Sequence, residues 1–97
     1  MLVGGIRSVY KLKFMCDGEM KYFIARRKAS VSPIILPQYT EVLFGKSLCI
    51  KIFDVTITIS YDVVYYTCGI VGVITSDTLK ELTNMGFKEV DENGFKQ

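Results

Sequence analysis

Two residues, Asp17 and Gly18, constrain the fold of this chain more than any others. They separate two segments, 8–15 and 19–27, and apolar residues alternate with polar ones along the first of these. Alternation with a period of two is typical of a β-strand with one buried face. Asp-Gly is also a preferred pair for a two-residue type I′ turn, because both central residues of that turn need a positive φ. We therefore predict a β-hairpin centred on this pair.

The turn fixes the register of the hairpin and so assigns each side chain to a face. With Asp17-Gly18 at the turn, Lys13 lies opposite Tyr22, and Val9 lies opposite Arg26. One face should belong to the core: Tyr10, Leu12, Phe14, Phe23 and Ala25. The other face mixes apolar and charged residues and should be hydrated: Val9, Lys11, Lys13, Tyr22, Ile24 and Arg26.

A change of phase marks the next part of the chain. Residues 39–44 predict a third strand and residues 48–60 a fourth, but in the fourth the apolar residues move from even to odd positions after Ile52. Such a slip turns half of a strand out of the core unless the backbone absorbs one residue. A β-bulge or a sharp bend at Phe53-Asp54 explains the slip better than a tight turn, because Phe suits a positive φ poorly.

The remaining elements complete a fold class. Residues 63–74 predict a further strand, residues 76–85 the one convincing helix, and residues 87–90 a last short strand. Ser76, Asp77 and Thr78 are the candidate N-caps, of which Thr78 has the spacing of a capping box with Glu81, and Gly86 suits the end of the helix. We predict one small globular domain over residues 1–97, with residues 90–97 frayed. Its fold should be α+β: a bulged, mostly antiparallel sheet of five or six strands, with one helix of the C-terminal half packed on one face.

The strand at 63–74 is apolar on both faces, which is typical of a central strand or of one covered by a partner. A helix of about nine residues covers only part of one sheet face. Either the apolar segment 34–36 or a second copy of the chain must then cover the other face. Tyrosine is enriched at interfaces, so we predict a homodimer with Tyr65, Tyr66 and Ile70 near the contact.

Charge is distributed unevenly along the chain. Residues 1–30 hold seven basic and two acidic residues, a net charge of +5, whereas the remaining residues have a net charge of −3. Cations beside an aromatic ring are the combination that binds single-stranded nucleic acid, and a two-stranded ribbon also fits the major groove of a duplex. The candidate binding residues are Lys11, Lys13, Tyr22, Arg26, Arg27 and Lys28. The alternative is an ordinary hydrated sheet face whose lysines discourage edge pairing.

Little in the composition points to catalysis or to a bound cofactor. The chain has no histidine, so Ser-His and Cys-His pairs are excluded, and no complete cofactor motif is present. We predict no enzyme, no catalytic residue, no cofactor and no metal site. Cys16, Cys49 and Cys68 form no CxxC pair and should be free thiols. Cys49 and Cys68 lie out of register for a disulfide.

The longest uncharged run of the apolar half, residues 63–76, is too short to span a bilayer, and the first residues do not resemble a signal peptide. We therefore expect a cytoplasmic protein with no membrane contact. Two function classes remain open. The first is a small non-catalytic interaction module that self-associates, and the alternative is a nucleic-acid-binding regulator that uses the basic N-terminal hairpin.

Overall fold

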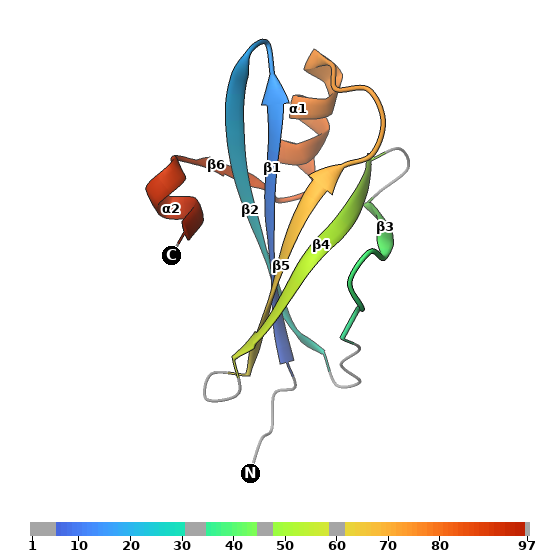
Figure 1. The fold of residues 1–97 in the computed structure, drawn as a ribbon, viewed down its shortest axis with the longest axis vertical. Coiled ribbons are helices and arrows are strands. Elements are labelled where there is room, and N and C mark those ends of the chain that lie inside the picture. The colour runs from blue at the N-terminus through green and yellow to red at the C-terminus, as the bar shows by residue number, and fades with distance from the viewer. Residues whose placement is uncertain (1–5, 31–34, 45–47, 59–61, 97) are drawn as a thin grey trace.

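The computed structural model describes residues 6–30, 35–44, 48–58 and 62–96. It has an α+β fold in which six strands form one open, mixed, mostly antiparallel sheet in the order β3-β4-β5-β1-β2-β6 (Figure 1). The strands are β1 (Ile6–Cys16), β2 (Glu19–Ser30), β3 (Glu41–Phe44), β4 (Leu48–Thr58), β5 (Val63–Ile70) and β6 (Lys88–Val90), and the helices are α1 (Ser76–Asn84) and α2 (Glu92–Lys96). The predicted fold class is confirmed.

The β1–β2 hairpin has the predicted register. Asp17 and Gly18 have φ values of 51° and 78°, as a type I′ turn requires. Lys13 lies opposite Tyr22, and the pairing continues in register to Ser8, before an irregularity near Ile6. The turn residues alone therefore place the side chains of two long strands on their faces.

Strand β5 is a central strand of the sheet. This is one of the two explanations given above for its two apolar faces, the other being a cover supplied by a partner. Strand β5 pairs with β4 in the antiparallel sense and with β1 in the parallel sense. It ends at Ile70 rather than Ile74, and Gly72 follows with a φ of 104°. A parallel pair needs a long connection, and here the connection from β1 to β5 contains three other strands of the same sheet.

The phase slip in β4 is a β-bulge, as predicted. Ile52 pairs with Cys68, and the next paired residue of β4 is Asp54, which lies opposite Thr67. Phe53 is the extra residue, and its side chain is 49% exposed. The bulge returns Val55 to the core side, because a bulge absorbs one residue without moving the rest of the strand to the other face.

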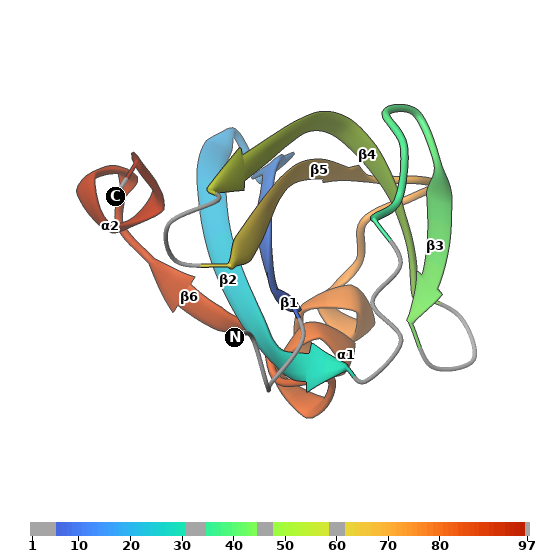
Figure 2. The same cartoon turned by 90° about the horizontal axis from the view of Figure 1, so that it is seen from below.

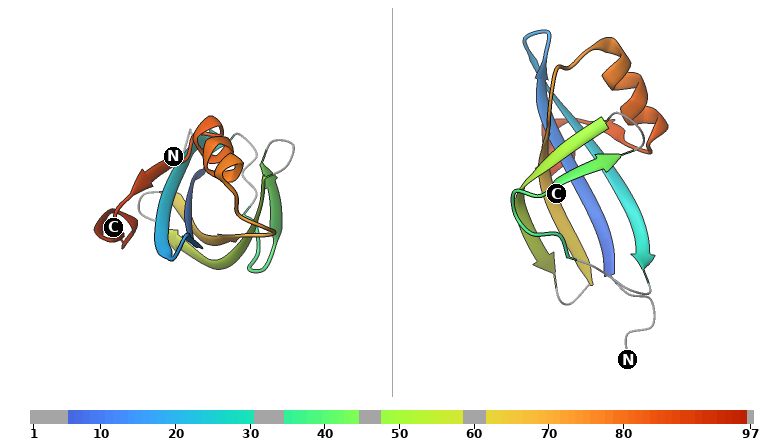
Figure 3. Two further views of the ribbon diagram at one scale, coloured as in Figure 1. Left: turned by 90° about the horizontal axis from the view of Figure 1, so that it is seen from above. Right: turned by 90° about the vertical axis from the view of Figure 1, so that its right-hand side faces the viewer.

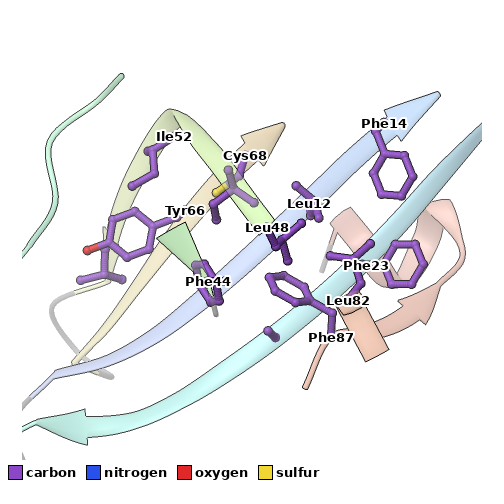
Figure 4. Close-up of a cluster of buried hydrophobic side chains, with 13 residues drawn as sticks. Leu12, Phe14, Phe23, Phe44, Leu48, Ile52, Tyr66, Cys68, Leu82 and Phe87 are labelled. Carbon is purple, nitrogen blue, oxygen red and sulfur yellow. The ribbon is translucent and has the colours of Figure 1, made fainter. Parts of the chain in front are cut away.

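The sheet is strongly curved, so its two sides differ. Figure 2 shows β3, β4, β5, β1 and β2 in an arc, with α1 between the two ends of the arc. We call the side towards α1 the concave face and the other the convex face. The main core lies on the concave face (Figure 4) and consists of Leu12, Phe14, Phe23, Ala25, Phe44, Leu48, Ile50, Ile52, Val64, Tyr66, Cys68, Leu82 and Phe87.

Helix α1 closes the open side of this core. Its N-cap is Thr75, whose N–H donates a hydrogen bond to Thr78 Oγ1 at 3.0 Å, so the cap lies one residue before the first of the three predicted candidates. Leu82 is fully buried. Gly86 ends the helix as predicted, with a φ of 90°, and the Phe87 N–H reaches back to the carbonyl of Leu82 at 2.9 Å.

The C-terminal end departs from the prediction of a frayed tail and of a single helix. After β6, residues Glu92–Lys96 form α2, which lies outside the arc (Figure 3). The Gly94 N–H donates to the Asp91 carboxylate at 2.7 Å, and the ring of Phe95 lies 5.0 Å from that of Tyr22. The Phe95 N–H also donates to the Asp91 carbonyl at 3.0 Å, and Lys96 lies 3.1 Å from Glu92. Local polar contacts and the packing of Phe95 therefore hold a segment whose sequence is mostly polar.

The segment before β3 covers the same face as α1, not the opposite one. Leu36 packs against the main core, and its N–H donates to Tyr66 Oη at 3.0 Å, while Ile35 is exposed and Ile34 lies outside the described residues. The convex face is closed by its own side chains, since Val9 and Val63 are only 6% and 7% exposed there. The prediction of a dimer depended on an uncovered apolar face of the sheet. The described residues of β1, β2 and β5 do not show such a face.

All three cysteines are free, as predicted. Cys49 pairs with Leu43, and Cys68 pairs with Ile52, so the two thiols belong to different rows of the sheet. Burial raises the pKa of the Cys68 thiol to about 12.

Candidate nucleic-acid interface

Basic side chains gather on the convex face where β1, β2, β5 and β6 lie together. The register places Lys11 opposite Ile24 and beside Thr67, and Ile24 in turn lies opposite Lys88. Residues paired across neighbouring strands share a face. We define the cationic face by its five basic side chains, which are Arg7, Lys11, Lys13, Arg26 and Lys88.

A second, smaller core lies under these cations. Val9, Ile24 and Val63 are buried together on the convex side, and Tyr65 and Val90 pack against them. The floor of the cationic face is therefore apolar. Burial lowers the pKa of Lys11, and the neighbouring positive charge of Arg26 lowers it further. The two cations are thus close enough to repel one another, which an anionic ligand would relieve.

Tyr65 is the aromatic side chain that stands among the cations. Lys11 Nζ lies 5.2 Å from the centre of the Tyr65 ring, within the range of a cation–π interaction. The ring borders two hollows of the convex face. The larger, of about 370 Å³, also contacts Arg7 and Arg26, and the smaller, of about 260 Å³, contacts Lys11. Tyr65 is thus flanked by cations on two sides.

Tyr22, the aromatic residue that the sequence pattern placed at the centre of the site, is covered by α2. Its ring lies 5.0 Å from that of Phe95, and Lys11 Nζ lies 5.8 Å from the same Phe95 ring. Phe95 therefore occupies part of the surface of the Tyr22 ring, whereas Tyr65 borders both hollows of the convex face. The sequence predicted Tyr65 at a dimer contact and not beside the hairpin cations. The parallel pairing of β1 with β5, which brings Tyr65 next to Val9, has no local signature in the sequence.

Arg27, also predicted to bind nucleic acid, faces the opposite way. Its Nη2 donates a hydrogen bond to the carbonyl of Met85 at 2.7 Å, and its guanidinium lies 5.3 Å from the centre of the Phe44 ring. Its role in the structure is to hold the C-terminus of α1 on the concave side. Lys28 is exposed further along β2, and Lys13 is exposed beside Tyr22.

The three predicted contact residues of a dimer do not form one surface. Tyr66 is 1% exposed, stacks on Tyr10 at 5.0 Å and accepts the hydrogen bond from Leu36, so it is a core residue and not an interface residue. Ile70 is partly buried against the main core. Of the three, Tyr65 alone lines a hollow of the convex face.

The described residues bring together no group of three side chains able to hold a metal ion. Within the same residues, no helix is long and apolar enough to cross a membrane. No family model matches the chain, and neither a curated protein nor a solved structure matches it. The function of the chain must therefore be inferred from the geometry and charge of the cationic face.

Proposed function

We propose that this protein binds nucleic acid through the cationic face. The observation that carries the proposal is the arrangement around the larger hollow, where Arg26 lies opposite Val9, Arg7 lies beside Val63, and Tyr65 lies on the other side of Val9. Neither guanidinium forms an ion pair with a carboxylate of the described residues. Arginine side chains without acidic partners bind phosphate groups well, because they present several donors in a fixed plane.

The distribution of acidic groups supports the same surface. Near the hairpin tip, Glu19 lies 3.9 Å from Lys21, which also lies 3.5 Å from Glu89, so this lysine is neutralised within the protein. On the convex side, Asp54 lies on β4, opposite Thr67 and beyond β5 from the hairpin cations. The basic side chains of the cationic face come from β1, β2 and β6, and a polyanion would be attracted to them.

The test is the binding of a fluorescein-labelled oligonucleotide, followed by anisotropy at several low salt concentrations. Arg26→Glu should weaken binding about tenfold or more, because a charge-assisted hydrogen bond is worth about 1.5–3 kcal/mol. It should also flatten the dependence of affinity on salt, since fewer counterions are released. Lys80→Glu, an equal charge change at an exposed position of α1, is the matched control and should have a smaller effect. Absence of binding by the wild type at low salt would refute the proposal.

Self-association is the second candidate function, and one observation favours it at a new place. At the end of the sheet near β3, three apolar side chains are exposed: Leu43 by 63%, Val71 by 41% and Val73 by 87%. Leu43 lies opposite Cys49, whose carbonyl accepts a hydrogen bond from the Val71 N–H on the other side, so the first two flank Cys49 in one row of the sheet. Light scattering of the wild type and of Leu43→Lys tests whether this patch joins two copies. A wild-type mass of 11.0 kDa at high micromolar concentration would exclude a dimer.

A further inference from the structure

The topology decides how the hairpin can meet a nucleic acid. Strands β1 and β2 lie inside the sheet, with β5 along one side and β6 along the other. A two-stranded ribbon enters the major groove of a duplex only if it is free of further strands, because that groove is about 12 Å wide and strands are about 4.8 Å apart. The part of the hairpin that carries the cations is therefore too wide to enter the groove.

The free tip of the hairpin does not supply an alternative. β5 pairs with β1 only as far as Leu12, so the tip extends beyond it. That tip carries Asp17 and Glu19, and its exposed large side chains are Met15 and Met20. Asp17 and Glu19 offset the charges of Lys13 and Lys21, so the tip has no net positive charge and little attraction for the phosphates of a duplex groove.

The larger hollow has instead the chemistry of a site for one nucleotide. Its volume of about 370 Å³ lies in the range of small-molecule sites. Its lining residues are Arg7, Ser8, Val9, Arg26, Arg27, Val63 and Tyr65. Of these, Val9 and Val63 are buried, Tyr65 is half-buried, and Arg7 and Arg26 are exposed. An apolar floor beside an aromatic ring suits the flat face of a base, whereas guanidiniums suit the phosphates on either side of it. Bases inside a duplex do not expose that face.

We propose that the cationic face selects single-stranded nucleic acid by stacking one unpaired base on Tyr65, with the neighbouring phosphates held by Arg7 and Arg26. Lys11, on the other side of the ring, then continues the path of the backbone towards the smaller hollow, which it lines together with Thr56 and Thr67. This inference rests on the proposed function. It adds the class of ligand, single-stranded nucleic acid, and the residue that distinguishes a single strand from a duplex, Tyr65.

Two variants at one position test the stacking. Tyr65→Phe keeps the ring, whereas Tyr65→Leu keeps an apolar side chain over Val9 and Val63 but removes the ring. Stacking of one base on an aromatic side chain corresponds to an affinity change of about 5- to 150-fold. We expect Tyr65→Leu to weaken single-strand binding within this range and Tyr65→Phe to retain it. Binding of a hairpin duplex of equal charge should be the same in both variants.

The assay uses a single-stranded oligonucleotide with one 2-aminopurine, in a DNA and an RNA version, so that the two sources of the same base are compared. Stacking quenches the fluorescence of 2-aminopurine, which should fall on binding to the wild type and to Tyr65→Phe but not to Tyr65→Leu. Circular dichroism of each variant checks that the fold is retained. Equal binding of single strand and duplex, or an unchanged affinity of Tyr65→Leu, would overturn the stacking and leave the proposed function intact. If the wild type binds neither ligand, the proposed function itself fails.

Discussion

Two adjacent arginines of β2 should respond to the same substitution in opposite ways. Both residues line the larger hollow, but the Arg26 side chain is exposed on the convex face, whereas the Arg27 guanidinium reaches the C-terminus of α1 on the concave side. Replacing either by methionine removes the guanidinium and keeps an unbranched apolar side chain, so burial of the aliphatic part of the arginine is largely preserved. Arg27→Met should therefore reduce stability, and Arg26→Met should reduce nucleic-acid binding.

The expected loss of stability follows from the contacts of Arg27. A hydrogen bond from a charged donor is worth about 1.5–3 kcal/mol, and here the donor is 2.7 Å from the Met85 carbonyl. The guanidinium over the Phe44 ring adds about 0.5–1 kcal/mol for a partly exposed cation–π contact. Water replaces some of the lost hydrogen bonding, because the contact is only partly buried. We expect a decrease of about 2–3 kcal/mol in the free energy of unfolding, a large fraction of the roughly 5–15 kcal/mol typical of a small protein.

Urea unfolding followed by far-ultraviolet circular dichroism measures this decrease, provided that the slope m is unchanged between variants. Arg26→Met is the matched control and should change the free energy of unfolding by no more than about 0.5 kcal/mol, because its side chain is exposed. The same two proteins are then compared in oligonucleotide binding. The reasoning is refuted if Arg27→Met is as stable as the wild type, or if it binds as weakly as Arg26→Met while remaining folded.

Three further predictions concern the bulge and the cysteines. A Cβ atom added at Gly69 would lie 2.6 Å from the Phe53 ring, so Gly69→Ala should destabilise the wild type more than it destabilises the Phe53→Ala variant. In a double-mutant cycle measured by urea unfolding, the coupling free energy should be about 0.5–3 kcal/mol, and additive effects would contradict the contact. Iodoacetamide at pH 8 should modify Cys16 and Cys49 but spare Cys68 until the protein unfolds, as counted by mass spectrometry. Because the folded-state pKa of Cys68 is raised from 9.0 to about 12, its stabilising contribution is complete below about pH 9 and is lost as the pH rises towards 12, and Cys68→Ala should reduce this alkaline loss.

The parts of the fold that could be predicted from the sequence are those with a local cause. The positive φ of Asp17 and Gly18 determines the hairpin register, and the phase slip after Ile52 locates the bulge at Phe53, since both effects act within a few residues. The end of α1 at Gly86 has the same local origin. Each of these predictions depends on backbone sterics or on the period-two alternation of side chains, and none of them needs knowledge of distant residues.

The parts that could not be predicted depend on contacts between distant segments. Parallel pairing of β1 with β5 joins residues more than fifty positions apart, and no turn sequence between the two strands predicts it. Helix α2 forms in a polar stretch because Phe95 packs on Tyr22. The same contact packs Phe95 on Tyr22, so the position of the C-terminal end, which the sequence did not predict, changes the surroundings of one predicted binding residue.

Adjacent residues of a strand must first be assigned to opposite faces of the sheet before a function is assigned to either. Arg26 and Arg27 form one adjacent pair, and Tyr65 and Tyr66 form another; in each pair one side chain lies on the convex surface and the other reaches into the concave side. The pairing of Val9 with Arg26 on one side and with Tyr65 on the other then aligns a cation, an apolar residue and an aromatic ring in a single row across three strands. Side-chain alternation and the parallel register together build the candidate site, and a change in either would put Arg26 and Tyr65 on different faces.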